Sequence, residues 1–303
     1  MFRSRDVRFE QEKLFSTKSL TSEIPASLDP LSADDNSNRL MKSHVDNNEI
    51  DRCLRFQDCV MNVESTHYLQ EQESFAGAAD SNQHGKWLEA MKSEIRSLNE
   101  NDTRTLEHLP ECCKALPCKW VYKVKQYLDG SVERYKAGLV IKGCSQRQGI
   151  DYGETFSSVV RSSSIRAVLS FAASQKMVLA QFDVSTAFLY GELEEEIYMH
   201  QPEGFDDGSG RVCRLKRSLY GLKQAPRCWN KRFGNFLRQL GFQQNKADPC
   251  IFMRVRGNEI IIALYVDDGQ MVATSEAEIK QLVADLESEF KVTAKEASYF
   301  LGL

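Results

Sequence analysis

The sequence predicts an α+β fold, in which an antiparallel sheet is covered by helices on one face. Short apolar runs of strand length occupy residues 177–182, 250–255 and 260–266. Two longer stretches, 229–240 and 275–290, have apolar residues at the spacing of an amphipathic helix. Along the chain these elements follow the order strand, helix, strand, strand, helix, and a closing strand is expected after them. This is the order of a split βαβ, or ferredoxin-like, sheet.

The length and composition are those of an ordinary globular chain. The 303 residues suffice for one or two domains with a hydrophobic core, and the net charge is −4. Because this balance argues against a generally basic coat, any nucleic-acid surface has to be a local patch. No apolar run approaches the roughly 18 residues of a membrane span. The first residues are not followed by the apolar segment that a secretory signal peptide requires. The nine cysteines form no Cys-x-x-Cys pair, which predicts reduced thiols in a cytoplasmic protein.

Residues 1–80 differ from the rest of the chain. They are rich in Ser, Asp, Asn, Glu and Gln and have no sustained apolar period, so we expect a mostly disordered, linker-like segment. The ordered part is expected to span 81–303. It begins with an amphipathic helix, in which Trp87, Met91 and Leu98 recur at helical spacing.

A β-hairpin with one cationic face is predicted for residues 119–142. In its first strand, lysines alternate with Trp120, Tyr122 and Val124, which places the apolar side chains on one face. An Asp-Gly turn separates this strand from the returning one. The opposite face is either simply solvated or binds phosphate groups. Its cations are Lys123, Lys125, Arg134, Lys136 and Lys142.

Three aspartates stand at the ends of apolar runs. Asp267 and Asp268 follow the run 260–264 and precede a glycine, a pattern typical of a β-hairpin with a tight, glycine-assisted turn. Taken alone, the pair is a polar surface turn. Two adjacent carboxylates repel each other, however, and a divalent cation shared with a third carboxylate would remove that repulsion. Asp183, which ends the run 177–182, is the candidate for this third ligand.

A run of cations without any Asp or Glu lies between residues 211 and 238. Trp229, Phe233 and Leu237 give a helix in this run its core face, so the cations fall on its other faces. One interpretation is a solubilising helix face, although such faces usually mix both signs of charge. The other is a set of unneutralised cations that binds the phosphates of a polyanion. The cations are Arg211, Arg214, Lys216, Arg217, Lys223, Arg227, Lys231, Arg232 and Arg238.

Three motifs, in the same order, resemble those of a known family. Tyr-Val-Asp-Asp at 265–268 resembles the metal-binding turn of reverse transcriptases, and Asp183 with Phe188 five residues later resembles their first metal motif. Between them, the stretch 218–229, Ser-Leu-Tyr-Gly-Leu-Lys-Gln-Ala-Pro-Arg-Cys-Trp, is very similar to the signature of Ty1/copia-class LTR retrotransposon Pol polyproteins. The resemblance implies a right-hand polymerase, with fingers at about 85–160 and a palm at about 161–303.

The resemblance also implies RNA- and DNA-templated DNA synthesis. Asp183, Asp267 and Asp268 would hold two Mg²⁺ ions, or Mn²⁺ in their place, for nucleotidyl transfer to a primer 3′-hydroxyl. Phe188 would lie under the sugar and select deoxynucleotides, and Gln224 would lie near the templating base pair. The residues implied in binding the deoxynucleoside triphosphate are Lys136, Phe188, Gln224 and Tyr265. Those implied in binding an RNA or DNA primer-template are Lys123, Lys125, Arg214, Lys216, Lys223 and Arg227.

Two positions depart from the family pattern. Gly138 stands where the copia class has arginine in Tyr-Lys-Ala-Arg-Leu-Val, which removes a planar bidentate donor. Ser158 stands where proline is usual, which relaxes the backbone. The sequence stops at Leu303, in a stretch that resembles the start of the primer grip, so we expect no thumb, connection or RNase H region. In the family, the polymerase is part of a Pol polyprotein in a cytoplasmic virus-like particle. The alternative function for this chain is that of a degenerate fragment that at most binds nucleic acid.

Overall fold

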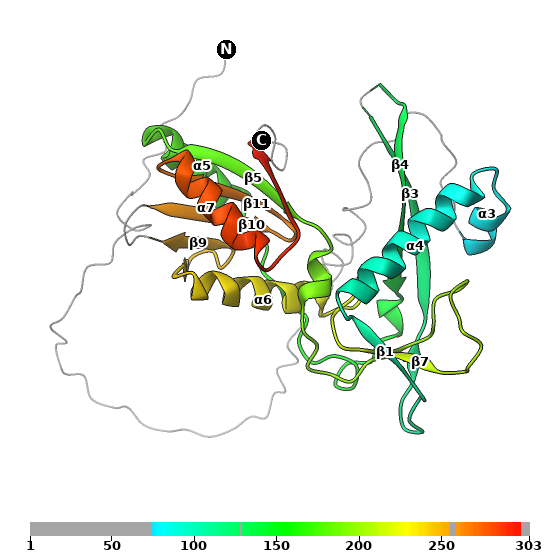
Figure 1. The fold of residues 1–303 in the computed structure, drawn as a ribbon. Coiled ribbons are helices and arrows are strands. Elements are labelled where there is room, and N and C mark those ends of the chain that lie inside the picture. The colour runs from blue at the N-terminus through cyan, green and yellow to red at the C-terminus, as the bar shows by residue number, and fades with distance from the viewer. Residues whose placement is uncertain (1–73, 128, 255–258, 298–303) are drawn as a thin grey trace, which may run out of the picture. The chain divides into compact units, whose positions relative to one another are not determined.

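Six antiparallel strands form the largest sheet of the computed structural model, which describes residues 74–127, 129–254 and 259–297 (Figure 1). The strand order is β12-β5-β11-β10-β9-β8. Among the elements of this sheet and its helices, β5 is followed in the chain by the helix Ala225–Gln239, then by β8, β9, β10 and β11, the helix Glu276–Glu287 and β12, so the predicted α+β class is confirmed. The strands are β5 (Val178–Val184), β8 (Gln243–Gln244), β9 (Ile251–Arg254), β10 (Ile260–Tyr265), β11 (Asp268–Ala273) and β12 (Val292–Glu296).

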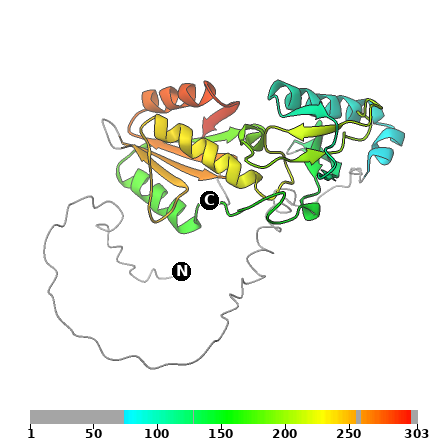
Figure 2. The same cartoon turned by 90° about the horizontal axis from the view of Figure 1, so that it is seen from below.

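Helices cover both faces of this sheet, so the prediction of helices on one face is wrong. The two helices α6 (Ala225–Gln239) and α7 (Glu276–Glu287) pack on one face, and α5 (Ser162–Ser174) packs on the other (Figure 2). The sequence of β10 explains this, because it is apolar at every position and therefore has two apolar faces. Its side chains Ile260, Ile262 and Leu264 join the core with α6 and α7, whereas Ile261 and Ala263 join the core with α5.

A second group of elements surrounds a two-stranded ribbon. β3 (Cys118–Gln126) and β4 (Val132–Ile141) pair as the predicted hairpin, and α4 (His84–Glu100) packs against β4. Trp120 and Tyr122 are buried on the α4 side, as their alternation with lysines predicts. A four-stranded sheet has the order β1-β7-β6-β2. Its strands are β1 (Arg104–Glu107), β2 (Ala115–Leu116), β6 (Tyr198–Met199) and β7 (Val212–Leu215), and two short 3-10 helices are η1 (Gly143–Ser145) and η2 (Ala187–Tyr190).

The chain divides into two units, residues 1–63 and 64–303, and every described residue belongs to the second. The helix α3 (Phe75–Asp80) lies within the segment that was predicted to be a linker, so ordered structure begins before residue 81. Ala78 in this helix is completely buried. The rest of the predicted linker, and the last residues, which resemble the start of the primer grip, lie outside the described residues.

Candidate active site

Strand register brings Asp183 and Asp268 face to face. In the pairing of β11 with β5, Asp268 lies directly opposite Asp183, and in the pairing of β10 with β11, Tyr265 lies directly opposite Asp268. Residues directly opposite on neighbouring strands point to the same face of a sheet. Tyr265, Asp268 and Asp183 therefore form one row across three strands. The row is on the face that α5 covers, where the Asp183 side chain is exposed.

Asp267 lies in the tight turn between β10 and β11. The carbonyl of Asp267 accepts a hydrogen bond from the backbone N–H of Val184 at 2.9 Å, which ties the turn to β5. Val266, the other residue of the two-residue loop, has φ +56°. A β-branched residue rarely adopts this left-handed conformation, and such strain clusters at functional sites.

The glycine after the two aspartates does not make the turn, which corrects the glycine-assisted turn that the sequence predicts. Gly269 lies within β11, directly opposite Phe182. A Cβ atom on Gly269 would lie 2.3 Å from the completely buried Phe182 ring. The position needs glycine because the ring crosses the neighbouring strand there, on the sheet face opposite to the aspartates.

Burial and mutual repulsion disfavour the ionised forms of the turn carboxylates. Burial raises the pKa of Asp267 to about 6, the carboxylates of Asp268 and Asp183 act in the same direction, and Lys136 opposes them. Burial, followed by the charge of Asp183, also raises the pKa of Asp268, against the influence of Lys295. The three acids therefore share one electrostatic environment, in which a cation would stabilise their ionised forms.

The donor chemistry of this site fits a hard divalent cation, but the side chains are not closed around one. Carboxylate oxygens are the ligands that Mg²⁺ prefers. In the described part of the chain, however, no group of three His, Cys, Asp or Glu side chains is arranged to hold a metal ion. The backbone register unites the three aspartates, and their side chains would have to turn inward to share an ion.

Phe188 follows Asp183 by five residues in the chain, but its side chain is largely covered. It lies in η2, just after β5, and is 8% exposed. The ring of Tyr220 covers it, with 4.7 Å between the ring centroids. Burial, and after it the carboxylates of Asp267, Glu94 and Asp183, raise the pKa of the Tyr220 hydroxyl. Tyr220 is thus a candidate site residue that the sequence analysis did not single out, although it belongs to the signature stretch 218–229.

The hairpin carries two facing pairs of cations. In the register of β3 with β4, Lys123 lies opposite Lys136, and Lys125 lies opposite Arg134. Like charges in directly opposite positions destabilise a sheet, and in this cation ladder the carboxylate of Glu133, 3.7 Å from the Arg134 Nε, offsets part of the repulsion. Burial, together with Lys123, Lys136 and Arg134, lowers the pKa of Lys125. The positive charge of Lys136 also opposes the rise in the pKa of Asp267.

Replacing Lys125 by methionine is expected to stabilise the protein, because it removes one of two facing cations. The free energy of unfolding should rise by up to about 1 kcal/mol, as measured by urea denaturation. Lys119→Met is the matched control, because Lys119 lies opposite Val140 on the same ribbon. Equal stabilisation by both substitutions would contradict the repulsion argued here.

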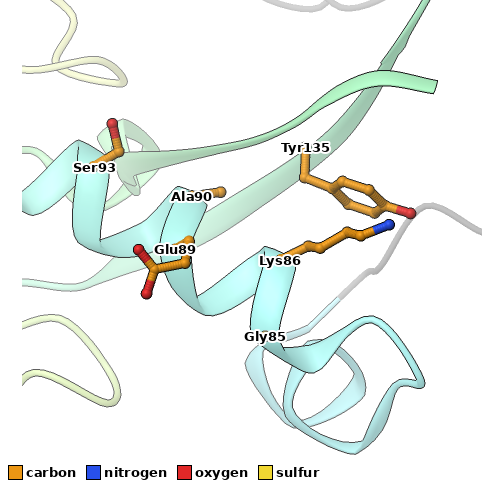
Figure 3. Close-up of a pocket in the computed structure, with 6 residues that line it drawn as sticks. All are labelled: Gly85, Lys86, Glu89, Ala90, Ser93 and Tyr135. Atoms are coloured by element: carbon orange, nitrogen blue, oxygen red, sulfur yellow. The ribbon is translucent and has the colours of Figure 1, made fainter.

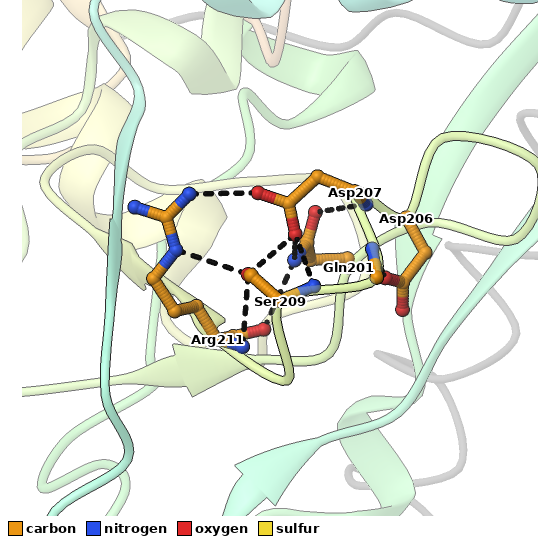
Figure 4. Close-up of polar contacts among 6 residues, drawn as sticks. Gln201, Asp206, Asp207, Ser209 and Arg211 are labelled. Atoms are coloured by element: carbon orange, nitrogen blue, oxygen red, sulfur yellow. Dashed lines mark hydrogen bonds and ion pairs between the residues drawn. The ribbon is translucent and has the colours of Figure 1, made fainter.

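Seven of the nine cations in the basic run at 211–238 pair with acids, so the expectation of unneutralised cations is wrong for these seven. The acids come from other segments of the chain, above all from 192–196, which sequence distance concealed. Because the pairs lie at the surface, each contributes at most about 1 kcal/mol to the free energy of unfolding. A polyanion could therefore displace the acids. Figure 4 shows one of these pairs, in which Arg211 contacts Asp207 at 2.7 Å. The others are Arg214 with Glu196 and Glu107, Lys216 with Asp102, Arg217 with Glu192, Arg227 with Glu154, Lys231 with Glu194 and Arg232 with Glu289.

Gln224 and Lys223 make internal contacts. Gln224 is 2% exposed; its Oε1 accepts from Gln146, and its Nε2 donates to the carbonyl of Asp151 and to Glu195. It could meet a nucleotide only by giving up these bonds, and the structure shows it as a link between the 146–151 loop and the start of α6. Lys223 donates to the Tyr152 hydroxyl at 3.1 Å and lies over that ring.

A surface pocket of about 540 Å³ lies away from the aspartates, between α4 and β4 (Figure 3). Lys86 extends over the Tyr135 ring there, 5.2 Å from its centroid. None of the sequence-predicted site residues lines it. Its lining residues are Gly85, Lys86, Glu89, Ala90, Ser93 and Tyr135.

Comparison with known proteins identifies the family. Residues 101–303 match the family described as "Reverse transcriptase (RNA-dependent DNA polymerase)". The chain is 43% identical over 235 residues to the "Retrovirus-related Pol polyprotein from transposon TNT 1-94" of Nicotiana tabacum, covering 75% of this chain and 18% of the relative. It is 41% identical over 223 residues to the corresponding transposon RE1 polyprotein of Arabidopsis thaliana, covering 72% of this chain and 15% of the relative.

A more distant relative is the "Transposon Ty1-GR3 Gag-Pol polyprotein" of Saccharomyces cerevisiae. It is 26% identical over 233 residues, which are 73% of this chain and 12% of that polyprotein. The chain thus spans less than a fifth of the length of each of these relatives. It belongs to the reverse transcriptase (RNA-dependent DNA polymerase) family, in the group found in the Pol polyproteins of Ty1/copia-type transposons.

Proposed function

We propose that this chain is the fingers and palm of an RNA-directed DNA polymerase that adds deoxynucleotides to a primer 3′-hydroxyl. The palm would be the six-stranded sheet with α5, α6 and α7, and the fingers would be the β3–β4 hairpin with α4. The observation that carries the proposal is the strand register that sets Asp268 opposite Asp183, one residue from Asp267 in the adjoining turn.

The three aspartates would hold two Mg²⁺ ions, because they are the carboxylates that register brings together. The chemistry supplied by bound Mg²⁺ is activation of the primer hydroxyl and stabilisation of the leaving pyrophosphate. Lys136 and the other cations of the ladder would orient the triphosphate and offset its charge. Phe188, with Tyr220 over its ring, would form the wall against the sugar. Template and primer would be held by backbone phosphate contacts that do not depend on sequence.

Primer extension by the purified chain tests the proposal. On a primed RNA template with deoxynucleoside triphosphates and Mg²⁺, we expect incorporation by the wild type and none by Asp183→Asn. The deoxynucleotide should be strongly preferred over the ribonucleotide. Absence of incorporation by both the wild type and the Gly138→Arg variant would overturn the proposal.

Gly138→Arg is expected to strengthen triphosphate binding. Gly138 lies opposite Val121, one step from the Lys123–Lys136 pair on the same face, and a Cβ atom there would meet nothing within 4 Å. An added guanidinium that makes a charge-assisted bond to a phosphate should lower the dissociation constant about tenfold. Gly138→Ala is the control for the backbone change. Equilibrium binding of a deoxynucleoside triphosphate measures the difference, and equal affinities in the two variants would contradict it.

A second candidate function is nucleic-acid binding without synthesis. It is favoured by the loss of a cation at Gly138 and by carboxylates that are not closed around a common point. Salt-dependent RNA binding that is equal in the wild type and in Asp183→Asn, without incorporation by either, would favour this candidate.

The remainder of a Pol polyprotein is the proposed neighbour of this chain, since its relatives are such polyproteins. A cytoplasmic location is supported by the seven cysteines of the described part, all of which are free thiols. Among the described helices, none combines the length and the apolar character that crossing a membrane requires.

A further inference from the structure

Two hydrogen bonds hold the turn that carries Asp267, one from each side. The indole Nε1–H of Trp229, in α6, donates to the carbonyl of Val266 at 2.6 Å. The backbone N–H of Val184, in β5, donates to the carbonyl of Asp267 at 2.9 Å. These two carbonyls belong to the two peptide planes that flank the Cα atom of Asp267. Fixing both planes fixes the direction in which the Asp267 side chain leaves the backbone.

The turn needs such support because its backbone is strained. Val266 has φ +56°, a conformation that costs a β-branched residue about 1–3 kcal/mol and persists only where the surroundings enforce it. The carboxylate of Asp267 also repels those of Asp268 and Asp183. Both effects favour rearrangement of the turn, and the bond from Trp229 opposes it.

Trp229 is itself held firmly. It is 1% exposed, and its ring centroid lies 5.1 Å from that of Phe233 and 5.3 Å from that of Phe290. Its helix packs closely on the segment after η2, where a Cβ atom on Gly191 would lie 2.8 Å from the Cβ of Cys228. The indole is therefore a fixed point to which the turn is attached.

We propose that Trp229 is a positioning residue, whose indole N–H holds the Val266 carbonyl and thereby fixes the backbone from which the Asp267 carboxylate turns toward Asp183 and Asp268. This inference rests on the proposed function, because it concerns the carboxylates that would bind the metal ions. Phenylalanine would fill most of the same core volume but has no N–H to donate. Trp229→Phe therefore separates positioning from packing.

Trp229→Phe is expected to weaken divalent-cation binding and to slow the chemical step. Losing the donor to a buried carbonyl should lower Mn²⁺ affinity and kcat about tenfold each, while KM for the deoxynucleotide changes less than about twofold. Mn²⁺ affinity is measured from the electron paramagnetic resonance signal of the free ion, which requires no catalysis. The kinetic constants come from single-nucleotide extension.

The chain offers a matched control in Trp120. This residue is 5% exposed, and its Nε1–H also donates to a backbone carbonyl, that of Glu203, at 3.0 Å. Trp120→Phe should cost similar stability but leave Mn²⁺ affinity and kcat unchanged. Equal effects of the two substitutions on kcat would mean that the Trp229 bond is merely structural.

Asp183→Asn distinguishes failure of this inference from failure of the proposed function. If it abolishes Mn²⁺ binding while Trp229→Phe leaves binding and kcat intact, the positioning role is overturned. If Asp183→Asn leaves Mn²⁺ binding intact, the metal site itself is wrong. Should Trp229→Phe fail to fold, the indole N–H resonance of the wild type decides. Mg²⁺ is expected to shift it, and an unmoved resonance would overturn the role.

Discussion

Asp267→Asn should abolish DNA synthesis and at the same time stabilise the fold. The substitution removes one of three carboxylates that would hold the metal ions, so primer extension should fall by at least about 1000-fold. It also removes a half-buried negative charge beside Asp268 and Asp183, whose repulsion the charge of Lys136 does not fully offset. A residue that is needed for catalysis and costs stability is typical of a preorganised site.

The stability gain should depend on pH, with a sign set by the raised pKa. Because the pKa of Asp267 is about 6 when folded, against an ordinary value of 3.8, the folded state disfavours its ionised form. The wild type should therefore lose stability as the pH rises from about 4 to about 6, and then remain at the lower level. At about pH 7.5 the variant should be more stable by on the order of 2 kcal/mol, whereas near pH 4 the two should be alike.

Urea denaturation in a chelator, at both pH values, measures this difference. Adding Mg²⁺ should stabilise the wild type more than the variant. Asp248→Asn is the matched control, because the Asp248 side chain is also buried but accepts hydrogen bonds from the backbone N–H groups of Arg161 and Cys250. That variant should be less stable than the wild type, and its folded fraction should keep full activity. An Asp267→Asn protein that is less stable at about pH 7.5 would contradict the prediction.

The strand ends that carry the acids could be predicted from sequence, because local signals determine them. Apolar runs of strand length end at Asp183 and at Asp267, and a two-residue hairpin loop fixes the register of its own strands. The alternation of lysines with Trp120, Tyr122 and Val124 likewise determined both faces of the β3–β4 ribbon.

Contacts between distant segments could not be predicted in this way. The acids at 192–196 neutralise cations 18 to 37 positions away. No periodicity in the acidic stretch or in the basic stretch 211–238 indicates which residues pair. Gln224 is buried by residues from the 146–151 loop for the same reason. Tyr220 becomes visible as a site residue only when Phe188 is seen under its ring. The helix on the second face of the sheet was not predicted, because the fully apolar sequence of β10 does not show whether helices cover one face or both faces.

Gly221→Ala is expected to lower the free energy of unfolding more than any of the other substitutions. Gly221 has φ +93°, and a Cβ atom there would lie 2.0 Å from the carbonyl oxygen of Ile141 and 2.8 Å from its nitrogen. Both are backbone atoms at the end of β4, which is fixed there by the hydrogen bond from the Ile141 N–H to the Tyr220 carbonyl at 2.8 Å. Side chains can rotate away from an added methyl group, but these atoms cannot.

The cost should exceed about 3 kcal/mol, since a left-handed backbone penalty is added to a clash with backbone that cannot relax. The midpoint of thermal unfolding should fall by about 10 °C. Gly138→Ala in the same β4 strand is the matched control, because its Cβ atom would meet nothing within 4 Å and its backbone is not left-handed, so it should change stability by less than about 1 kcal/mol.

Gly221→Ala should affect ligand binding as well as stability. The close backbone contact between Gly221 and Ile141 joins the strand that carries Lys136 of the cation ladder to the segment that leads into α6. One side of the contact is β4, which carries Lys136; the other is the stretch from Tyr220 to Trp229. Forcing them apart should weaken triphosphate binding even at temperatures where Gly221→Ala is still folded. If folded Gly221→Ala binds the triphosphate with wild-type affinity, the contact between Gly221 and Ile141 matters for folding alone. If the midpoint of thermal unfolding does not change, the two backbone segments are not in close contact at Gly221.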